Sequence, residues 1–344
     1  AMRGKVVVLG TATAAVIAYF LYRCSRGGRA APKKFDIFAP LRNADLSTMT
    51  AADFMRVLKS CVNSPEAIER AKKFVPRDGD VVTLTTPKTG QTWLLAQLRI
   101  LSLGAGGCTS DTMLAAGMQE GVDGVCWLEH PRSGLAMNDA QPGQFRVFKS
   151  HLELQDMRAT LEASPNAKFI TTLRAPTDLS PSLYKHMRGT YAMRANGGDG
   201  APFDARFTPS DFALAGEPAG YEANLVAWLE VRDLPNVMIV FYEDMVAEPA
   251  VALRRLADFV GVVLDAELEQ ETLQTTSYER MSAGGSAWQN VHPGGGTYGK
   301  GRGQLSTAAL EAIDARWRQV VTPATGTDTY EQLYEKVRGR PFPL

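Results

Sequence analysis

The chain has 344 residues, which is enough for one large domain with a substantial buried core. Hydrophobic residues make up 45% of it and charged residues 22%, as in ordinary globular proteins. Basic and acidic residues balance at 37 each, so the total charge does not point to nucleic acid or another polyanion as a partner. The four cysteines are scattered, without a CxxC pair or a Cys/His cluster, and indicate neither a metal site nor a required disulfide.

Residues 6–22 form a continuous stretch without charge, flanked by basic residues on both sides. The stretch is slightly shorter than the about 20 apolar residues that span a bilayer, and the aromatic residues at its end suit a membrane interface. We favour a membrane anchor, while a secretory signal or an organelle-targeting peptide remains an alternative. Because more positive charge follows the stretch than precedes it, an anchored chain would have its main domain in the cytosol. We therefore assign residues 1–35 to an anchor or targeting segment and linker, and residues 36–344 to one domain.

Helices are expected over residues 47–59 and 65–74, before the most informative part of the chain. Residues 81–85 form an apolar run rich in β-branched side chains, which predicts a buried parallel strand. Residues 94–101 place apolar side chains at helical spacing. The stretch between them, residues 86–93, reads Thr-Pro-Lys-Thr-Gly-Gln-Thr-Trp and is therefore a tight turn from a strand into a helix.

This turn has the composition of an anion-binding site. Gly90 allows backbone N–H groups to turn toward a ligand. Lys88, the hydroxyls of Thr89 and Thr92 and the free N–H groups of the helix start could all contact the same anion. The alternative is an ordinary strand–helix turn with a chance lysine. It is not a Walker A loop, because here the lysine precedes the glycine.

The next strand is expected over residues 146–151, where Lys149 and His151 fall on the same face because side chains alternate along a strand. A fixed cation then lies beside a titratable imidazole. The other histidines, His130, His186 and His292, have no such partner in the sequence. We interpret His151 as a candidate catalytic residue, with a structural histidine as the alternative.

Residues 168–173 predict a third strand that ends at Arg174, followed by a helix that carries Ser182. Ligands of open α/β sheets bind beyond the carboxyl ends of the strands, so Arg174 is placed to hold a second phosphate. The alternative is a solvated arginine that caps a loop. Residues 189–220 are rich in Gly, Ala and Pro and predict a lid or a substrate-facing loop.

A further strand, residues 236–241, leads into the phrase Tyr-Glu-Asp-Met and then a helix over residues 251–260. Residues 275–281 read Thr-Thr-Ser-Tyr-Glu-Arg-Met, and residues 294–305 form a flexible, basic loop rich in glycine. On their own these segments indicate a strand end, a helix cap and a surface loop.

Together the motifs resemble those of sulfotransferases that use 3′-phosphoadenosine 5′-phosphosulfate (PAPS). The family patterns are Pro-Lys-Ser/Thr-Gly-x-Thr-Trp, Lys-Thr/Ser-His, Arg-x-Pro-x-Asp-x-x-x-Ser, Phe-Tyr-Glu-Asp-Met, Thr-Ser-Phe-x-x-Met and Arg-Lys-Gly-x-x-Gly. Their counterparts occur here in the family's order over residues 75–310. Residues 126–129, Cys-Trp-Leu-Glu, are similar to an element that borders the acceptor pocket in the family.

The resemblance implies an α/β fold with three α/β/α layers, a central mostly parallel sheet and a P-loop-like phosphosulfate loop. It implies PAPS as co-substrate and no metal. His151 is the expected general base, and Lys88 and Lys149 are expected to stabilise charge at the sulfuryl group. The expected donor-binding residues are Lys88, Thr89, Gly90, Gln91, Thr92 and Trp93 for the 5′-phosphate, Arg174, Ser182, Lys300, Gly301 and Arg302 for the 3′-phosphate, and Tyr242, Thr276, Tyr278 and Met281, together with Trp93, for the adenine.

The sequence departs from the family pattern at three places. Gln91 replaces a usual threonine, Gly299 stands where the family has arginine, and Leu305 lies near the place of a usual tryptophan. A protein that binds PAPS but has lost turnover is therefore one alternative to an enzyme, and a lumenal glycan sulfotransferase is another. A P-loop kinase is a distant third.

The expected acceptor is the hydroxyl or amine of a small hydrophobic molecule. This rests on an apolar tilt of the segments expected to line the acceptor pocket: Met113, Leu114, Met118, Trp127 and Met137. The sequence assigns no oligomeric state and no nucleic-acid partner.

Overall fold

The computed structural model describes residues 38–62, 65–106, 125–129, 137–141, 143–283 and 296–343. The expected membrane anchor at residues 6–22 lies outside these ranges and stays a prediction. In the part of the chain that the structure describes, none of the helices combines the length and the hydrophobicity needed to cross a bilayer.

A parallel five-stranded sheet forms the centre of the molecule, in the order β2-β3-β1-β4-β5. The strands are β1 (Val81–Leu84), β2 (Cys126–Trp127), β3 (Val147–Ser150), β4 (Lys168–Leu173) and β5 (Val237–Phe241). The central strand β1 is buried along its whole length, with β3 on one side and β4 on the other. Because all the strands are parallel, their carboxyl ends meet at one edge of the sheet, and the segments that carry Lys88, His151, Arg174 and Tyr242 follow those ends.

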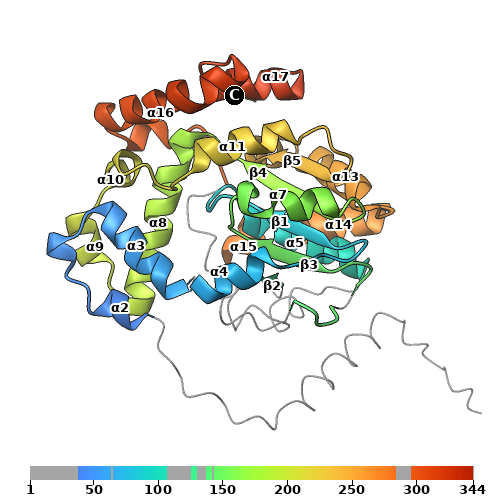
Figure 1. Ribbon diagram of the computed structural model, residues 1–344, viewed down its shortest axis with the longest axis horizontal. Coiled ribbons are helices and arrows are strands. Elements are labelled where there is room, and N and C mark those ends of the chain that lie inside the picture. The colour runs from blue at the N-terminus through green and yellow to red at the C-terminus, as the bar shows by residue number, and fades with distance from the viewer. Residues whose placement is uncertain are drawn as a thin grey trace, which may run out of the picture.

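Helices cover both faces of the sheet (Figure 1). Side chains alternate along each strand, so Val81 faces one core and Val82 faces the other. Helices α5 (Gln91–Leu103), α13 (Pro249–Val260) and α14 (Ala266–Thr275) pack on the Val81 face. Helices α4 (Pro65–Lys72), α7 (Leu154–Ala163) and α11 (Tyr221–Glu230) pack on the Val82 face. This confirms the predicted α/β fold with three layers.

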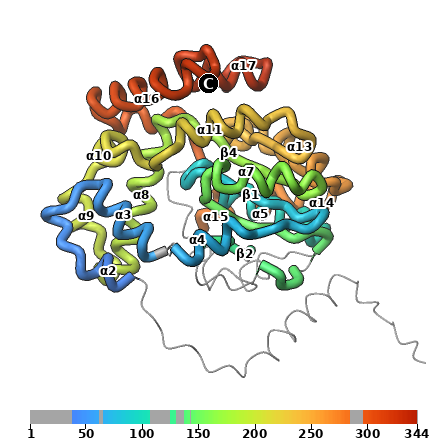
Figure 2. The backbone as a smooth tube through the Cα atoms, viewed as in Figure 1, coloured from blue at the N-terminus to red at the C-terminus, as the bar shows by residue number. Residues whose placement is uncertain are grey.

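A helical lobe lies beside the sheet (Figure 2). It contains α2 (Ala39–Arg42), the 3-10 helix η1 (Leu46–Thr48), α3 (Ala51–Val62), α8 (Pro176–Ala195), α9 (Ala201–Arg206) and α10 (Pro209–Leu214). Its core is aromatic: Phe54, Phe203, Phe207 and Phe212 are fully buried against one another.

The expectation of a long loop over residues 189–220 is therefore wrong. Helix α8 continues to Ala195, and prolines in the first turns of α9 and α10 start two further helices, where a missing N–H costs nothing. The segment is rich in glycine, alanine and proline, which suggests a loop, but it also contains three phenylalanines that are buried in the fold. Those phenylalanines supply the hydrophobic faces that stabilise such short helices.

The remaining elements complete the edge of the sheet and one side of the molecule. They are α12 (Tyr242–Ala247), α15 (Tyr278–Ala283), the 3-10 helix η4 (Arg302–Gln304), α16 (Thr307–Thr325) and α17 (Tyr330–Arg338). In Figure 1, α16 and α17 run along one side of the molecule, above α11. They share a core with β5 and α11, in which Tyr330 and Tyr334 pack against Phe241 and Trp317 packs against Tyr330.

Candidate active site

The turn between β1 and α5 is sharply bent. Lys88 has a φ of 73° and Gly90 a φ of 109°. A side chain at Gly90 would place its Cβ 2.8 Å from the ring of Tyr242, so only glycine fits. Among the described residues, the backbone N–H groups of residues 90–93 have no backbone acceptor in the protein. The turn therefore presents a row of free donors at a helix N-terminus, as an anion-binding site requires.

Two side chains of this turn face the core and not a ligand. The Thr89 hydroxyl is fully buried and donates to the Thr86 carbonyl oxygen at 2.7 Å, while the Thr172 hydroxyl lies 2.6 Å from it. Gln91 Nε2 donates to the Ser150 carbonyl oxygen at 3.0 Å. The single proton of the Thr89 hydroxyl is thus used within the protein, and its contact with an anion stays a prediction. Gln91 therefore ties α5 to the end of β3.

Three cations gather at the carboxyl edge of the sheet. Lys88 and Arg174 follow β1 and β4, and Lys149 lies on β3 with its Nζ 4.4 Å from the centroid of the Trp127 ring. Burial, followed by the positive charges of Arg174 and Lys149, lowers the pKa of Lys88 to about 7. So much positive charge in one place is costly unless an anion neutralises it.

His151 follows β3 and is held in one tautomer. Its Nδ1 lies 2.8 Å from the carbonyl oxygen of Thr85. Since a carbonyl oxygen can only accept, Nδ1 carries the proton and Nε2 keeps its lone pair. Burial and the charge of Lys149 lower the pKa of His151 to about 3, so the imidazole is neutral at physiological pH. His151 and Lys149 both contact Trp127, which agrees with their predicted place on one face.

Glu129 is a buried acid whose position the sequence did not explain. Its carboxylate accepts from the backbone N–H of His151 at 2.5 Å and from the Ser150 hydroxyl at 2.9 Å. Burial raises the pKa of Glu129, while these hydrogen bonds act in the opposite direction. Glu129 therefore holds the end of β3, and with it the backbone of His151. The acidic end of the Cys-Trp-Leu-Glu cluster was the only signal for it.

Arg174 joins the turn after β1 to the glycine-rich loop near the C-terminus. Its guanidinium stacks on the ring of Tyr242, with Cζ 4.2 Å from the centroid. It donates to the Lys88 carbonyl oxygen at 3.2 Å and to the Thr297 carbonyl oxygen at 3.4 Å. Trp93 also contacts Tyr242, edge-on with the ring centroids 6.2 Å apart.

Of the other residues expected at the adenine, Tyr278 lies near Tyr242 of this group. Tyr278 starts α15, and a side chain at Gly296 would place its Cβ 2.6 Å from the Tyr278 ring. Thr276 and Met281 are buried, and the Thr276 hydroxyl donates to the Thr272 carbonyl oxygen at 2.7 Å.

The glycine-rich loop is attached to the start of α8 by Asp178, which the sequence analysis missed. The Asp178 carboxylate accepts from the N–H groups of Gly299 at 2.7 Å and Gly301 at 2.6 Å. A side chain at Gly301 would place its Cβ 2.2 Å from the Thr177 carbonyl oxygen. The loop therefore rests directly on α8, with Lys300 exposed beside it.

Two more expected residues lie close to this contact in sequence and fold. Ser182 lies on α8, four residues after Asp178 and on the same face of the helix. Arg302 begins η4 and is exposed. The signal for Asp178 was its place between Arg174 and Ser182 in the motif.

Comparison with known proteins identifies the family. A family model described as "Sulfotransferase domain" matches residues 78–315, well over half of the chain. The chain belongs to this family. Rat Sulfotransferase 2A6 is 26% identical over 258 residues, covering 70% of this chain and 84% of the relative. Human Sulfotransferase 1C2 is 24% identical over 211 residues, covering 61% of this chain and 68% of the relative. The family assignment makes the protein a sulfotransferase enzyme, which transfers a sulfonate group.

Solved structures with the same fold agree with this assignment. Mouse sulfotransferase SULT7A1 complexed with PAP superposes with a TM-score of 0.56 at 16% identity, covering 75% of this chain and 90% of that one. Retinol dehydratase complexed with retinol and PAP gives a TM-score of 0.55 at 16% identity, covering 75% and 87%. At 16% identity, these superpositions show that the fold is shared and nothing more specific.

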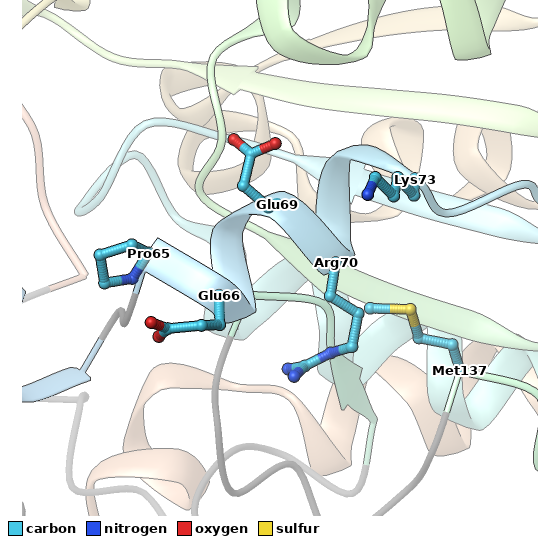
Figure 3. A pocket seen from close by; sticks show the side chains of 6 residues that line it. All are labelled: Pro65, Glu66, Glu69, Arg70, Lys73 and Met137. Carbon is cyan, nitrogen blue, oxygen red and sulfur yellow. The ribbon is translucent and has the colours of Figure 1, made fainter.

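The described residues also form an open groove on the sulfotransferase, which includes Met137 from the expected acceptor pocket. It has a volume of about 650 Å³ and is lined by Pro65, Glu66, Glu69, Arg70, Lys73 and Met137 (Figure 3). None of the residues that the sequence placed at the donor site or at His151 lines it. Among the described residues, no group of His, Cys, Asp and Glu side chains could hold a metal ion.

Proposed function

We propose that this sulfotransferase moves a sulfuryl group from PAPS to a hydroxyl or amine of a small hydrophobic acceptor, with His151 as the general base. The observation that carries the proposal is the tautomer of His151. Because Thr85 fixes the proton on Nδ1, the lone pair of Nε2 is left for an acceptor proton, beside Lys149 and close to the anion-binding turn.

The donor is assigned to the groups that the structure gathers at the carboxyl edge of the sheet. The N–H groups of residues 88–93 and the Lys88 ammonium bind the 5′-phosphosulfate. Arg174, Ser182 and the loop residues Lys300, Gly301 and Arg302 bind the 3′-phosphate. The adenine lies among Trp93, Tyr242, Thr276, Tyr278 and Met281, where aromatic faces are available for stacking.

The chemistry then needs one proton transfer and one displacement. His151 Nε2 takes the proton of the acceptor hydroxyl as the acceptor oxygen forms its bond to sulfur. The bond from sulfur to the bridging phosphate oxygen breaks, and its electron pair stays on that oxygen. Lys88 and Lys149 stabilise the resulting negative charge, as fixed cations do in the related transfer of phosphoryl groups. The charges of the bound donor raise the low pKa of His151 toward a value suited to a base.

The acceptor class is supported by the surroundings of His151. Trp127 lies edge-on to the imidazole, with 5.5 Å between ring centroids, and offers an apolar surface at the base. Met137, also expected at the acceptor pocket, packs on the opposite face of the sheet with Val82 and Phe148, and gives this assignment no support. The other residues of the apolar tilt, Met113, Leu114 and Met118, lie outside the described residues.

The alternatives are separated by simple measurements. A protein that binds PAPS without turnover would transfer sulfate to none of a panel of phenols, aliphatic alcohols, sterols and saccharides. A lumenal glycan enzyme would modify only the saccharides, and its domain would be protected from protease in sealed vesicles. We propose instead that residues 6–22 attach a cytosolic domain to a membrane. In inside-out vesicles the domain then lies on the outer surface, where added protease should digest it.

The first experiment compares PAP, the 3′,5′-bisphosphate product, with 5′-AMP and ATP in a thermal-shift titration of the full chain. Ligand at 100 times its dissociation constant stabilises a protein by about 2.7 kcal/mol, which is easily seen. We expect selective stabilisation by PAP. The variant His151→Ala should bind PAP normally and lose about 10²–10⁴-fold in turnover, the usual worth of a general base. Equal shifts with all three nucleotides would contradict the donor assignment, and near-normal turnover of His151→Ala would contradict the base assignment.

A further inference from the structure

The backbone on both sides of the Arg174 side chain is held by side chains from other elements. The Arg174 carbonyl oxygen accepts from the Tyr221 hydroxyl at 2.5 Å, and the Arg174 N–H lies 3.2 Å from the same oxygen. The next N–H, that of Ala175, donates to Glu243 Oε1 at 2.9 Å. Tyr221 begins α11 and Glu243 lies on α12, so two helices fix one short stretch after β4.

Glu243 is held in turn by the C-terminal helix. The Tyr330 hydroxyl, from the start of α17, donates to Glu243 Oε2 at 2.9 Å. Both side chains are buried, and Tyr330 also packs edge-on against Phe241 and Trp317. A buried carboxylate is stable only with its hydrogen-bond donors in place. Glu243 therefore links the two elements, with one oxygen bonded to Ala175 and the other to Tyr330.

We propose that Glu243, Tyr221 and Tyr330 are positioning residues for Arg174, and that α17 is through them a working part of the donor site. This rests on the proposed role of Arg174 at the 3′-phosphate. Among the described residues, the guanidinium makes two hydrogen bonds, of 3.2 and 3.4 Å, besides its stack on Tyr242. Its direction is therefore set largely by the backbone, and small displacements of a binding group have large effects on a fixed ligand.

A second tyrosine of α17 provides a matched control. Tyr334 lies one turn after Tyr330, is equally buried, and donates to Asp244, the residue next to Glu243. Asp244 is bonded to Arg340 at 2.6 Å and Arg338 at 2.7 Å. None of the hydrogen bonds and ion pairs that the described residues show for this second set involves the backbone of Arg174 or Ala175. The two tyrosines thus fasten the same helix, and only one of them reaches the donor site.

The test measures dissociation constants of PAP and 5′-AMP for the full chain and the variants Tyr330→Phe, Tyr334→Phe and Arg174→Ala. We expect Tyr330→Phe to lower the preference for PAP over 5′-AMP about tenfold, the factor that corresponds to 1.4 kcal/mol. Its affinity for 5′-AMP should change less than about twofold, because only the 3′-phosphate contact is displaced. In turnover, its KM for PAPS should rise while kcat falls little. Tyr334→Phe should lower thermal stability and leave the preference unchanged.

Tyr221→Phe provides an independent measurement, because it acts on the other side of Arg174 and leaves α17 intact. It should show the same loss of preference, and it carries the test alone if Tyr330→Phe does not fold. A wild-type chain without preference for PAP, or an Arg174→Ala variant that keeps it, would refute the donor assignment and this inference together. If Arg174→Ala loses the preference while Tyr330→Phe and Tyr221→Phe keep it, only the positioning role is refuted. An equal loss of the preference for PAP in Tyr334→Phe would also refute the positioning role, since the effect would then come from weaker packing of α17 as a whole.

Discussion

Donor binding should weaken as the pH rises above 7, because Lys88 is then uncharged in the free protein. Burial and the neighbouring cations Arg174 and Lys149 lower the pKa of Lys88 to about 7. A bound polyanion favours the protonated form, so the pKa of Lys88 in the complex moves back toward its ordinary value. Below pH 7 the ammonium is present in both states, and pH has no effect through this group. Above pH 7, binding has to take up one proton.

The magnitude follows from the pKa difference. Each pH unit above the free pKa and below the bound pKa weakens binding up to tenfold, or by about 1.36 kcal/mol. At pH 9, about two units above the free pKa, the expected loss is about 100-fold, or about 2.7 kcal/mol. The phosphates of PAP titrate near pH 6, so the range from pH 7.5 to 9 reports on the protein.

The assay is calorimetric titration with PAP between pH 7.5 and 9, in buffers with different heats of ionisation. The dependence of the observed heat on the buffer gives the number of protons taken up. Lys88→Arg is the matched control, because arginine keeps its charge over this range and should remove most of the pH dependence. Glu243 also has a pKa raised by burial to about 7, so Glu243→Gln is a second control for the group behind Arg174.

An affinity that stays constant from pH 7.5 to 9, with no proton uptake, would refute this reasoning. It would mean that Lys88 is still protonated in the free protein. Proton uptake that persists unchanged in Lys88→Arg would assign the effect to another group.

Three shorter predictions test other parts of the site. Gly301→Ala should weaken PAP binding about 10²-fold, because the new Cβ would overlap the Thr177 carbonyl oxygen and displace the loop from α8. Wild-type affinity of this variant would show that the loop does not bind the donor in this position. Glu129→Ala should lower the free energy of unfolding by about 1–3 kcal/mol in a urea titration, because it leaves two buried donors without an acceptor, and an unchanged midpoint would contradict this. Thr89→Val should lower the free energy of unfolding by about 1 kcal/mol with PAP affinity unchanged, whereas a selective loss of affinity would restore the hydroxyl to the donor site.

The sequence was sufficient for the fold and for the region of the site. Runs of β-branched residues marked β1 and β4, because a buried parallel strand has apolar side chains on both faces. The carboxyl ends of parallel strands meet at one edge, so Lys88, His151 and Arg174 could be placed together from three separate segments. This placement follows from where each residue stands after its strand and requires no information on side-chain contacts.

The directions of individual side chains could not be predicted in the same way. Thr89 and Gln91 belong to the anion-binding turn in sequence, yet both side chains bond to groups of the core. The partners of Glu243 are equally hidden, since Tyr330 lies 87 residues away. Contacts of this kind depend on how helices pack against each other. The local hydrophobic pattern of a sequence predicts only which face of an element is apolar, and so it cannot identify such partners.

The backbone of Lys88 has a consequence for how this protein would respond to selection. Among the described residues, Lys88 is the only non-glycine residue with a positive φ, and such a conformation costs about 1–2 kcal/mol. Glycine would adopt it without that cost. A library screened for heat resistance alone should therefore enrich Lys88→Gly early and discard the lysine on which sulfuryl transfer is proposed to depend. A strained backbone conformation would therefore be retained at position 88 only under selection for activity.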